Sequence, residues 1–406
     1  MIRLLLAVLV LIAVAPAAHA HLTPSSSVEL DFNEREVSAQ ITIPLAELSY
    51  AYGEPLPTPQ AMLSSRLIVR APDGRLWRMV IKSSKISGDQ FARDQQFDVS
   101  LTPPAGAPLR KFALTYTLVT DKVATHNVLV FARSDFNGGT LQGHPEMIGA
   151  FQQVRSTINI DRGEASAWNG FFASITLGMH HIAEGHDHLL FLITLLLPAP
   201  LIAVGRRWGA YEGIKPTLRQ LLMVVTAFTI GHSITLIGGA FFGWQLPSQP
   251  VEIAIAVSIL VSAIHAWRPL FAGREALVAA SFGLIHGLAF ATVIANFGLE
   301  PLAKATAILG FNLGIELVQI GVILGVLPLL IWLAQSPHFG IVRNVAAGLA
   351  AAAALAWVFE RVTETENGFA RGIDVSLGYA PFVIIPLSIV ALGALIYRSR
   401  LERVSL

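Results

Sequence analysis

Seven apolar segments between residues 166 and 400 constrain the fold of this 406-residue chain more than any other feature. Each has roughly the 20 residues that an α-helix needs to cross a bilayer. The segments lie at 171–197, 217–240, 249–267, 275–295, 304–334, 341–360 and 378–397. We therefore expect residues 166–400 to form an α-helical polytopic membrane bundle of seven transmembrane helices.

The composition agrees with a membrane protein. Only 14% of the residues are charged, against about 25% in an average soluble domain. The net charge of +1 and the lack of long basic runs give no sign of a nucleic-acid partner. The chain has no cysteine, which excludes disulfides, zinc–thiolate sites, iron–sulfur ligation and cysteine nucleophiles.

The first 20 residues have the pattern of a secretory signal peptide. Arg3 gives a positive start, residues 4–14 are apolar, and Ala18-His19-Ala20 fits a small-residue cleavage site. The alternative is an uncleaved anchor. Cleavage after Ala20 makes His21 the first residue, where a free amine beside an imidazole is able to chelate Cu(II); the alternative is a chance histidine.

Residues 21–165 alternate between apolar and polar side chains, the pattern of half-buried strands. The alternation is clearest at 28–32 and 37–43, and an Asp-Gly turn at Asp73 separates two further strand-like runs. The expected strands are 28–32, 37–43, 67–70, 76–81, 97–101, 112–116, 127–131 and 154–160. Short strands at this density favour an exported, periplasmic all-β domain similar to a β-sandwich.

The loop charges predict the orientation. With an exported N-terminal domain, seven spans place the C-terminus in the cytoplasm. Ten basic residues then fall inside and three outside, as the positive-inside rule requires. The inside residues are Arg206, Arg207, Lys215, Arg219, Arg268, Arg274, Arg343, Arg398, Arg400 and Arg403; the outside residues are Lys304, Arg361 and Arg371. A bacterial inner membrane is the expected location.

The first expected span carries a group of metal-ligand side chains. On a continuous helix, five of them fall within an arc of about 120°, and intramembrane polar groups usually face the bundle interior. These residues are His180, His181, Glu184, Asp187 and His188. Imidazoles with carboxylates suit Ni(II), Co(II), Zn(II) or Cu(II). A proton relay and a polar packing cluster without metal are the alternatives.

Three further residues lie at a similar depth in other spans: His232, His286 and Glu316. With His181, they are roughly 12–20 Å from the expected outer ends of their helices, at 1.5 Å per residue. We expect them to meet the first group in one plane. Each taken alone also fits a helix–helix hydrogen bond.

Four motifs resemble the HupE/UreJ family of bacterial membrane proteins, in the branch with an exported N-terminal domain. They are His181-x5-Asp187-His188, Phe228-Thr229-Ile230-Gly231-His232-Ser233, Phe282-Gly283-Leu284-Ile285-His286-Gly287 and Phe311-Asn312-Leu313-Gly314-Ile315-Glu316. The resemblance covers about residues 166–330. The motifs are also similar, more distantly, to those of nickel/cobalt transporters. The resemblance implies a nickel permease or an accessory protein of hydrogenase or urease maturation.

The interpretation is an inner-membrane protein that binds and transports a divalent transition metal. Its ligands are His181, Asp187, His188, His232, His286 and Glu316, with Glu184 in reserve. Nickel is the first candidate, and cobalt, zinc and copper are the others; the bilayer and the metal are the partners. One alternative is a membrane-anchored accessory factor that binds a periplasmic protein through its β domain. A membrane enzyme is the least favoured, because no His-Glu-x-x-His motif or nucleophile is apparent.

Overall fold

The computed structural model describes residues 25–404 except 55, 57, 89–92 and 296–298. The expected signal peptide at 1–20 and His21 lie outside the described residues. The chain divides into two compact units. The sheet unit comprises the described residues up to Arg133 together with Pro145–Gly163, and the helical unit comprises Ser134–His144 and Glu164 onward.

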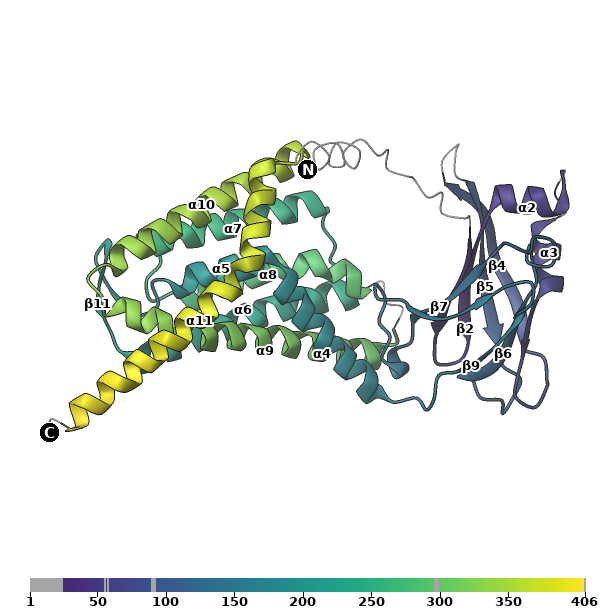
Figure 1. Cartoon of the computed structure of the whole chain (residues 1–406), viewed down its shortest axis with the longest axis horizontal. Helices are drawn as coiled ribbons and strands as arrows, with labels where there is room; N and C mark the ends of the chain where they lie inside the picture. Colours follow the sequence, from purple (N-terminus) through teal and green to yellow (C-terminus); the bar gives the residue numbers. More distant parts are fainter. Residues whose placement is uncertain (1–24, 55, 57, 89–92, 296–298, 405–406) are drawn as a thin grey trace, which may run out of the picture. The chain divides into compact units, whose positions relative to one another are not determined.

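The sheet unit contains two sheets (Figure 1). The six-stranded sheet has the order β4-β5-β2-β1-β7-β8 and the three-stranded sheet the order β3-β6-β9. The bounds are β1 Ser26–Phe32, β2 Val37–Pro44, β3 Leu67–Arg70, β4 Arg78–Gly88, β5 Arg93–Thr102, β6 Lys111–Tyr116, β7 Val128–Ser134, β8 Glu146–Phe151 and β9 Thr157–Asp161. The β-rich N-terminal part that the alternation predicts is confirmed.

The two sheets share one hydrophobic core. In β1 and β2 every second side chain is buried, since successive side chains of a strand point to opposite faces. Leu30 and Ile41 of the larger sheet and Leu114 of the smaller one belong to the same buried cluster. The helices α2 (Leu45–Tyr52) and α3 (Pro59–Arg66) and strand β8 are additions to the expected strands.

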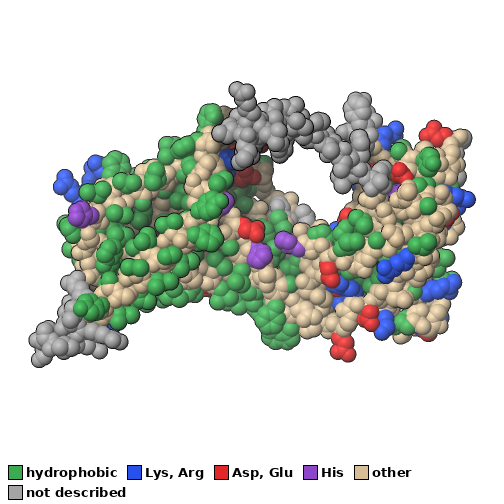
Figure 2. All heavy atoms as spheres, viewed as in Figure 1, with side chains coloured by type: hydrophobic (Ala, Val, Ile, Leu, Met, Phe, Trp, Pro, Cys, Tyr) green, Lys and Arg blue, Asp and Glu red, His purple; other side chains and the backbone are tan. Residues whose placement is uncertain are grey.

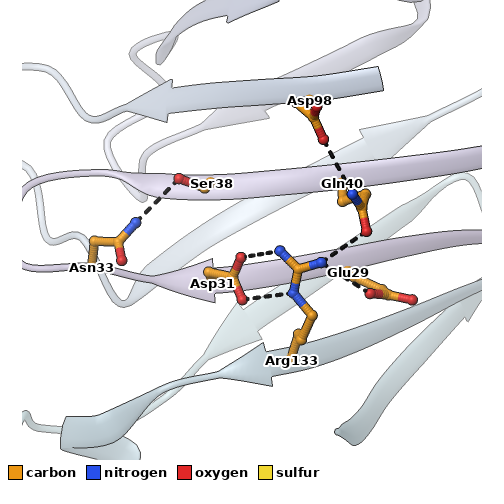
Figure 3. Close-up of polar contacts among 7 residues, drawn as sticks. All are labelled: Glu29, Asp31, Asn33, Ser38, Gln40, Asp98 and Arg133. Carbon is orange, nitrogen blue, oxygen red and sulfur yellow. Dashed lines mark hydrogen bonds and ion pairs between the residues drawn. The ribbon is translucent and has the colours of Figure 1, made fainter. Parts of the chain in front are cut away.

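The other face of the larger sheet carries a chain of charged contacts across its strands (Figure 3). Arg133 on β7 donates from Nε to Asp31 on β1 (3.0 Å) and from Nη1 to Oε1 of Gln40 on β2 (2.8 Å). The Gln40 amide in turn donates to Asp98 on β5 (3.2 Å). These cross-strand pairs tie four neighbouring strands together on the polar face.

The helical unit contains eight α-helices among the described residues, and a two-stranded hairpin. Their bounds are α4 Ala167–Glu184, α5 His186–Leu196, β10 Leu201–Val204, β11 Arg207–Tyr211, α6 Ile214–Phe242, α7 Ser248–Trp267, α8 Glu275–Ala295, α9 Pro301–Ala334, α10 Phe339–Thr363 and α11 Gly368–Val404. A short 3₁₀ turn, η1 (Phe136–Gly138), also belongs to it.

Five of the described helices are long and apolar enough to cross a membrane: α6, α7, α9, α10 and residues Gly368–Tyr397 of α11. Helix α5 and residues Glu275–Ala291 of α8 are shorter apolar helices. Large apolar side chains such as Leu309 on α9 and Val390 on α11 are exposed. In Figure 2 hydrophobic side chains dominate the visible face of the helical unit, whereas charged ones gather on the sheet unit. The protein is therefore a membrane protein.

Candidate metal centre

A break at Gly185 divides the first expected span into α4 and α5. Gly185 has φ −76° and ψ 89°, outside the helical region, and α5 starts at His186. A Cβ atom on Gly185 would lie 2.8 Å from the carbonyl oxygen of His181 and 2.8 Å from Nδ1 of His188. Since real Cβ atoms do not approach so closely, only glycine fits. The unbroken helix on which the 120° arc depended is thus not formed.

The break nevertheless brings three histidines of the helical unit together. One ring nitrogen each from His181, His188 and His232 lies within 4.8 Å of the other two. The ring centroid of His181 is 4.9 Å from that of His188 and 6.2 Å from that of His232. His188 and His232 are buried, with 7% and 0% exposure, and His181 is partly buried. We call these three residues the triad.

Aromatic rings form apolar walls around the triad. Phe290 of α8 and Phe311 of α9 have centroids 4.6 and 5.3 Å from the His181 ring, and Phe228 of α6 is 6.3 Å from the His188 ring. The Nε2 atoms of all three triad histidines are buried and have no hydrogen-bond partner among the described residues. Buried polar atoms are normally paired, so three unpaired imidazole nitrogens in one histidine cluster point to a ligand.

Two polar neighbours fix the tautomers of two triad residues, His188 and His232. Nδ1 of His188 lies 2.9 Å from Oδ1 of Asp187, which only accepts when ionised. Nδ1 of His232 lies 3.4 Å from Oδ1 of Asn312. The Asn312 amide nitrogen donates to the carbonyl of Ile308 at 2.9 Å, which orients its oxygen toward the ring. Both rings therefore carry their proton on Nδ1 and keep an Nε2 lone pair free, the arrangement of metal-binding histidines.

His286 of α8 stands next to the triad. Its ring centroid is 4.7 Å from that of His188, and its Nε2 lies 3.1 Å from Oγ of Ser258 on α7. The Ser258 hydroxyl donates to the carbonyl of Ile255 at 2.6 Å, so its oxygen accepts from His286. The Nδ1 of His286 is then the lone-pair nitrogen, and it too is buried and without a partner among the described residues.

Glycines allow the helices that carry these residues to touch. A Cβ on Gly283 of α8 would lie 2.1 Å from the carbonyl oxygen of Phe228 on α6, and one on Gly231 equally close to that of Ala280. Between α4 and α9, a Cβ on Gly178 would lie 2.0 Å from the carbonyl of Phe311. Small residues permit such backbone contact between membrane helices.

The two expected carboxylates Glu184 and Glu316 are not members of the triad. The Glu184 side chain is 80% exposed, and its contact is with His180, at 3.8 Å. Oε1 of Glu316 accepts from the hydroxyl of Thr226 at 3.2 Å. Glu316 lies one helical turn beyond Asn312 on α9, so the residue of that motif that reaches the triad is the asparagine.

His265 of α7 has a different environment. Its Nδ1 accepts from the backbone N–H of Leu270 (3.1 Å) and lies near that of Phe271 (3.4 Å). The proton is therefore on Nε2, which lies 3.8 Å from Oε1 of Glu275. This histidine fixes the loop after α7, and it offers no free lone pair.

The donor set fits a borderline divalent cation. Neutral imidazoles are good ligands for nickel, cobalt, zinc and copper, and the Asp187 carboxylate offsets part of the ion's charge. Nitrogens bound to one tetrahedral ion at bond lengths of about 2.1 Å lie about 3.4 Å apart. The triad nitrogens, which lie within 4.8 Å of one another, exceed that spacing by at most about 1.4 Å.

Two contacts of the site were not expected from the sequence. Ser258 is a single hydroxyl in an apolar span, and nothing in the residues around it marks it as a partner of His286. Arg361, expected only as a loop charge, places Nη2 at 3.8 Å from Oδ2 of Asp187. The two residues are 174 positions apart, and no local pattern connects them.

A protein-family model described as HupE / UreJ protein matches residues 156–361, about half of the chain, including every residue of the triad. No curated protein matches the sequence.

Proposed function

Because this chain belongs to the HupE/UreJ family, we propose that it binds a divalent transition metal, nickel first, within the membrane and passes it inward. The family handles transition metals as transporters or accessory proteins, so the proposal includes no enzymatic step. Cobalt, zinc and copper are the other candidate cargoes. The ion is a substrate here and leaves the protein again.

The observation that carries the proposal is the set of unpaired Nε2 atoms in the triad. A hydrogen-bonded polar cluster that serves packing alone pairs its buried nitrogens with one another. In this site Nδ1 of His188 and Nδ1 of His232 pair with Asp187 and Asn312, and the Nε2 atoms of all three rings stay unpaired. The proton relay considered as an alternative needs a hydrogen-bonded chain, and the three Nε2 atoms are not part of one.

We assign each of these residues a role along the path of an ion that enters from outside. Asp187 attracts the ion and orients His188; His181, His188 and His232 bind it; His286 takes part through its free Nδ1. Glu316, one turn further along α9, receives the ion on the inner side, and the exposed Glu184 lies at the entrance. Weak, multiple contacts of this kind permit release.

The orientation belongs to the same proposal. Seven crossings, with α4 and α5 together forming the first, place the sheet unit in the periplasm and the C-terminus in the cytoplasm. The excess of Arg and Lys in the loops assigned to the inside supports this. An N-terminal signal peptide at 1–20 completes the export route.

The test is metal accumulation by cells that express the full chain. We expect uptake of nickel, or of one of the other three metals, to rise with expression and to fall to the background level with His181→Ala plus Asp187→Ala. His180→Ala is the matched control, because this neighbouring histidine lies outside the triad. Unchanged accumulation of all four metals, or full uptake by the double variant, contradicts the proposal.

The accessory role is the second candidate, favoured by one observation. All residues of the large hydrophobic core around Leu30 and Leu114 belong to the sheet unit, so this unit is built as a module of its own, suited to binding a periplasmic protein. A chain without residues 25–133 and 145–160 distinguishes the two. Retained uptake assigns the work to the helical unit, whereas lost uptake with intact metal binding favours the accessory role.

A further inference from the structure

A cavity of about 640 Å³ opens in the helical unit beside Asp187. It is bounded by the break between α4 and α5, the start of α7, the end of α10 and the start of α11, and we call it the vestibule. Seven of its fourteen lining residues are acidic. Arg361 is the only Arg or Lys among the lining residues in the described part of the chain.

The guanidinium of Arg361 lies between two carboxylates of the vestibule. Its Nη2 is 3.8 Å from Oδ2 of Asp187, and its Nε is 3.8 Å from Oε2 of Glu252. The central guanidinium carbon, Cζ, is 5.9 Å from the centroid of the Trp357 ring. The backbone carbonyl of Arg361 accepts a hydrogen bond from the Gln249 side chain at 3.0 Å. The backbone of Arg361 is thus fixed by a hydrogen bond, whereas its guanidinium group makes only ion pairs of 3.8 Å.

The two oxygens of Asp187 face different partners. Oδ1 accepts from the ring and the backbone N–H of His188, each at 2.9 Å, and Oδ2 faces Arg361. The same carboxylate therefore connects the triad with the vestibule. A cation that approaches the triad from the vestibule meets Oδ2 at the place where the guanidinium is.

We propose that Arg361 is a displaceable electrostatic gate, which occupies the cation position on the vestibule side of Asp187 and yields it to an incoming divalent ion. The proposal rests on the metal-binding function of the triad. The contact between Arg361 and Asp187, at 3.8 Å, is too long for a charge-assisted hydrogen bond and is therefore a weak ion pair, and the remaining carboxylates of the vestibule are alternative partners for the displaced guanidinium. A doubly charged ion gains more from Asp187 than a singly charged one, so the gate also favours divalent cations.

A purely structural role of Arg361 predicts the opposite sign. If the guanidinium only fastens the end of α10 to the α4–α5 break, its removal loosens Asp187 and weakens metal binding. If it is a gate, its removal frees Oδ2, so that association becomes faster and binding tighter. Metal binding to the purified full-length protein therefore separates the two roles.

The experiment uses Co(II) as the probe, followed by its visible absorption in stopped-flow and equilibrium titrations. Arg361→Gln should bind the same number of ions as the wild type, with association roughly two- to fivefold faster, the range of a weak ion pair. Arg371→Gln is the matched control. This variant also removes one positive charge near the vestibule, but Arg371 is 69% exposed and pairs with Glu366 instead of Asp187.

A second pair of variants tests the gate without removing the arginine. Glu252→Gln removes the outer partner of Arg361, so the guanidinium should hold Asp187 more firmly and association should slow. Glu366→Gln removes the same charge from another vestibule residue and should slow association less. In the background of Arg361→Gln the difference between these two variants should vanish, since the coupling passes through the arginine.

Equal rates for Arg361→Gln and Arg371→Gln, or weaker binding by Arg361→Gln, overturn the gate while leaving the triad function standing. Failure of the triad function gives a different result: the wild type binds no Co(II), or His181→Ala plus His232→Ala binds it unchanged. That result contradicts both the metal-binding function of the triad and the gate. If Arg361→Gln does not fold, the Glu252 and Glu366 variants alone decide the question.

Discussion

Nδ1 of His188 lies 2.9 Å from Oδ1 of Asp187, its neighbour in sequence, and the opposite nitrogen of the ring, Nε2, is buried and unpaired within the cluster with His181 and His232. Adjacent residues on a helix normally point in directions 100° apart. Here the helix begins only at His186, so the carboxylate of Asp187 is free to turn back and accept from both the ring and the backbone N–H of His188.

Replacing this carboxylate should weaken metal binding more than a lost charge alone explains. In Asp187→Asn the amide no longer selects the His188 tautomer, and affinity should fall by about 10- to 100-fold, as for other partners of metal-bound histidines. Calorimetric titration of the purified protein measures this. Asp374→Asn is the control, because it removes a vestibule carboxylate that contacts His186 and not the triad. Equal losses in both variants contradict the prediction.

The glycine at the helix break should not tolerate a methyl group. In Gly185→Ala the new Cβ collides with the backbone carbonyl of His181 and the ring of His188, so the His181 backbone and the His188 ring must shift, which disturbs the triad. We expect strongly reduced metal binding with the helix content by circular dichroism retained. Gly348→Ala, on α10 with no heavy atom within 4 Å of the new Cβ, should bind as the wild type does. Wild-type affinity in Gly185→Ala refutes the role of the break.

The contact between α6 and α8 should also not tolerate a methyl group, and here the expected effect is a loss of stability. A Cβ on Gly283 would lie 2.1 Å from the Phe228 carbonyl, and overpacking of this kind costs roughly 1–3 kcal/mol. Gly283→Ala should lower the Tm of the detergent-solubilised protein. Gly325→Ala on α9, where the Cβ meets nothing within 4 Å, is the control and should leave the Tm unchanged or raise it.

The sheet unit should lose stability below neutral pH through His126. This ring is buried and lies 3.2 Å from Glu47 and 2.8 Å from the Ser26 hydroxyl. Burial lowers its pKa below the ordinary value of 6.5, and Glu47 offsets this only in part. The unfolded chain then binds a proton more readily, so stability is complete above about pH 6.5 and falls by up to about 1.4 kcal/mol per pH unit below it.

Hydrogen exchange of the sheet-unit amides in the full chain, corrected for the intrinsic pH dependence, measures this loss between pH 7.5 and 5. His126→Gln should flatten the dependence in that interval. The exposed His144 is the control, and His144→Gln should leave the slope as it is. An unchanged slope in His126→Gln assigns the loss to other groups.

The proposed orientation can be read from single cysteines, since the chain has none of its own. Ser248→Cys lies in the wall of the vestibule and should react with an impermeant thiol reagent applied to the periplasmic side. Arg206→Cys, in the turn between β10 and β11, should react only after the inner membrane is opened. The reverse pattern excludes inward transport from the periplasm by the proposed route.

Much of the architecture was predictable because its signals are local. Alternation over 28–32 and 37–43 marks β1 and β2 since one face of each strand is buried in the core. The apolar segments beyond residue 200 correspond to helices α6 to α11. Helices α2 and α3 were not expected, since each is only 8 residues long and short helices owe their stability to tertiary packing.

The site was predictable in its ligand types but less so in its geometry. His181, His188 and His232 stood out because imidazoles are costly in a membrane span, and the structure brings them together. The arc was expected only if Gly185 did not break the helix, and the sequence left that condition open, since glycine also occurs within membrane helices. The structure has the break. The contact of Asp187 with Arg361 escaped prediction, because it depends on how distant helices pack.

Glycine contacts bring α6 against α8 and α4 against α9, backbone against backbone. His232 and His286 lie on the first of these helix pairs, and His181 and Asn312 lie on the second. The nitrogens of the candidate site are therefore divided between two closely packed helix pairs, and the distance between the rings of His181 and His232 depends on how one pair is placed against the other.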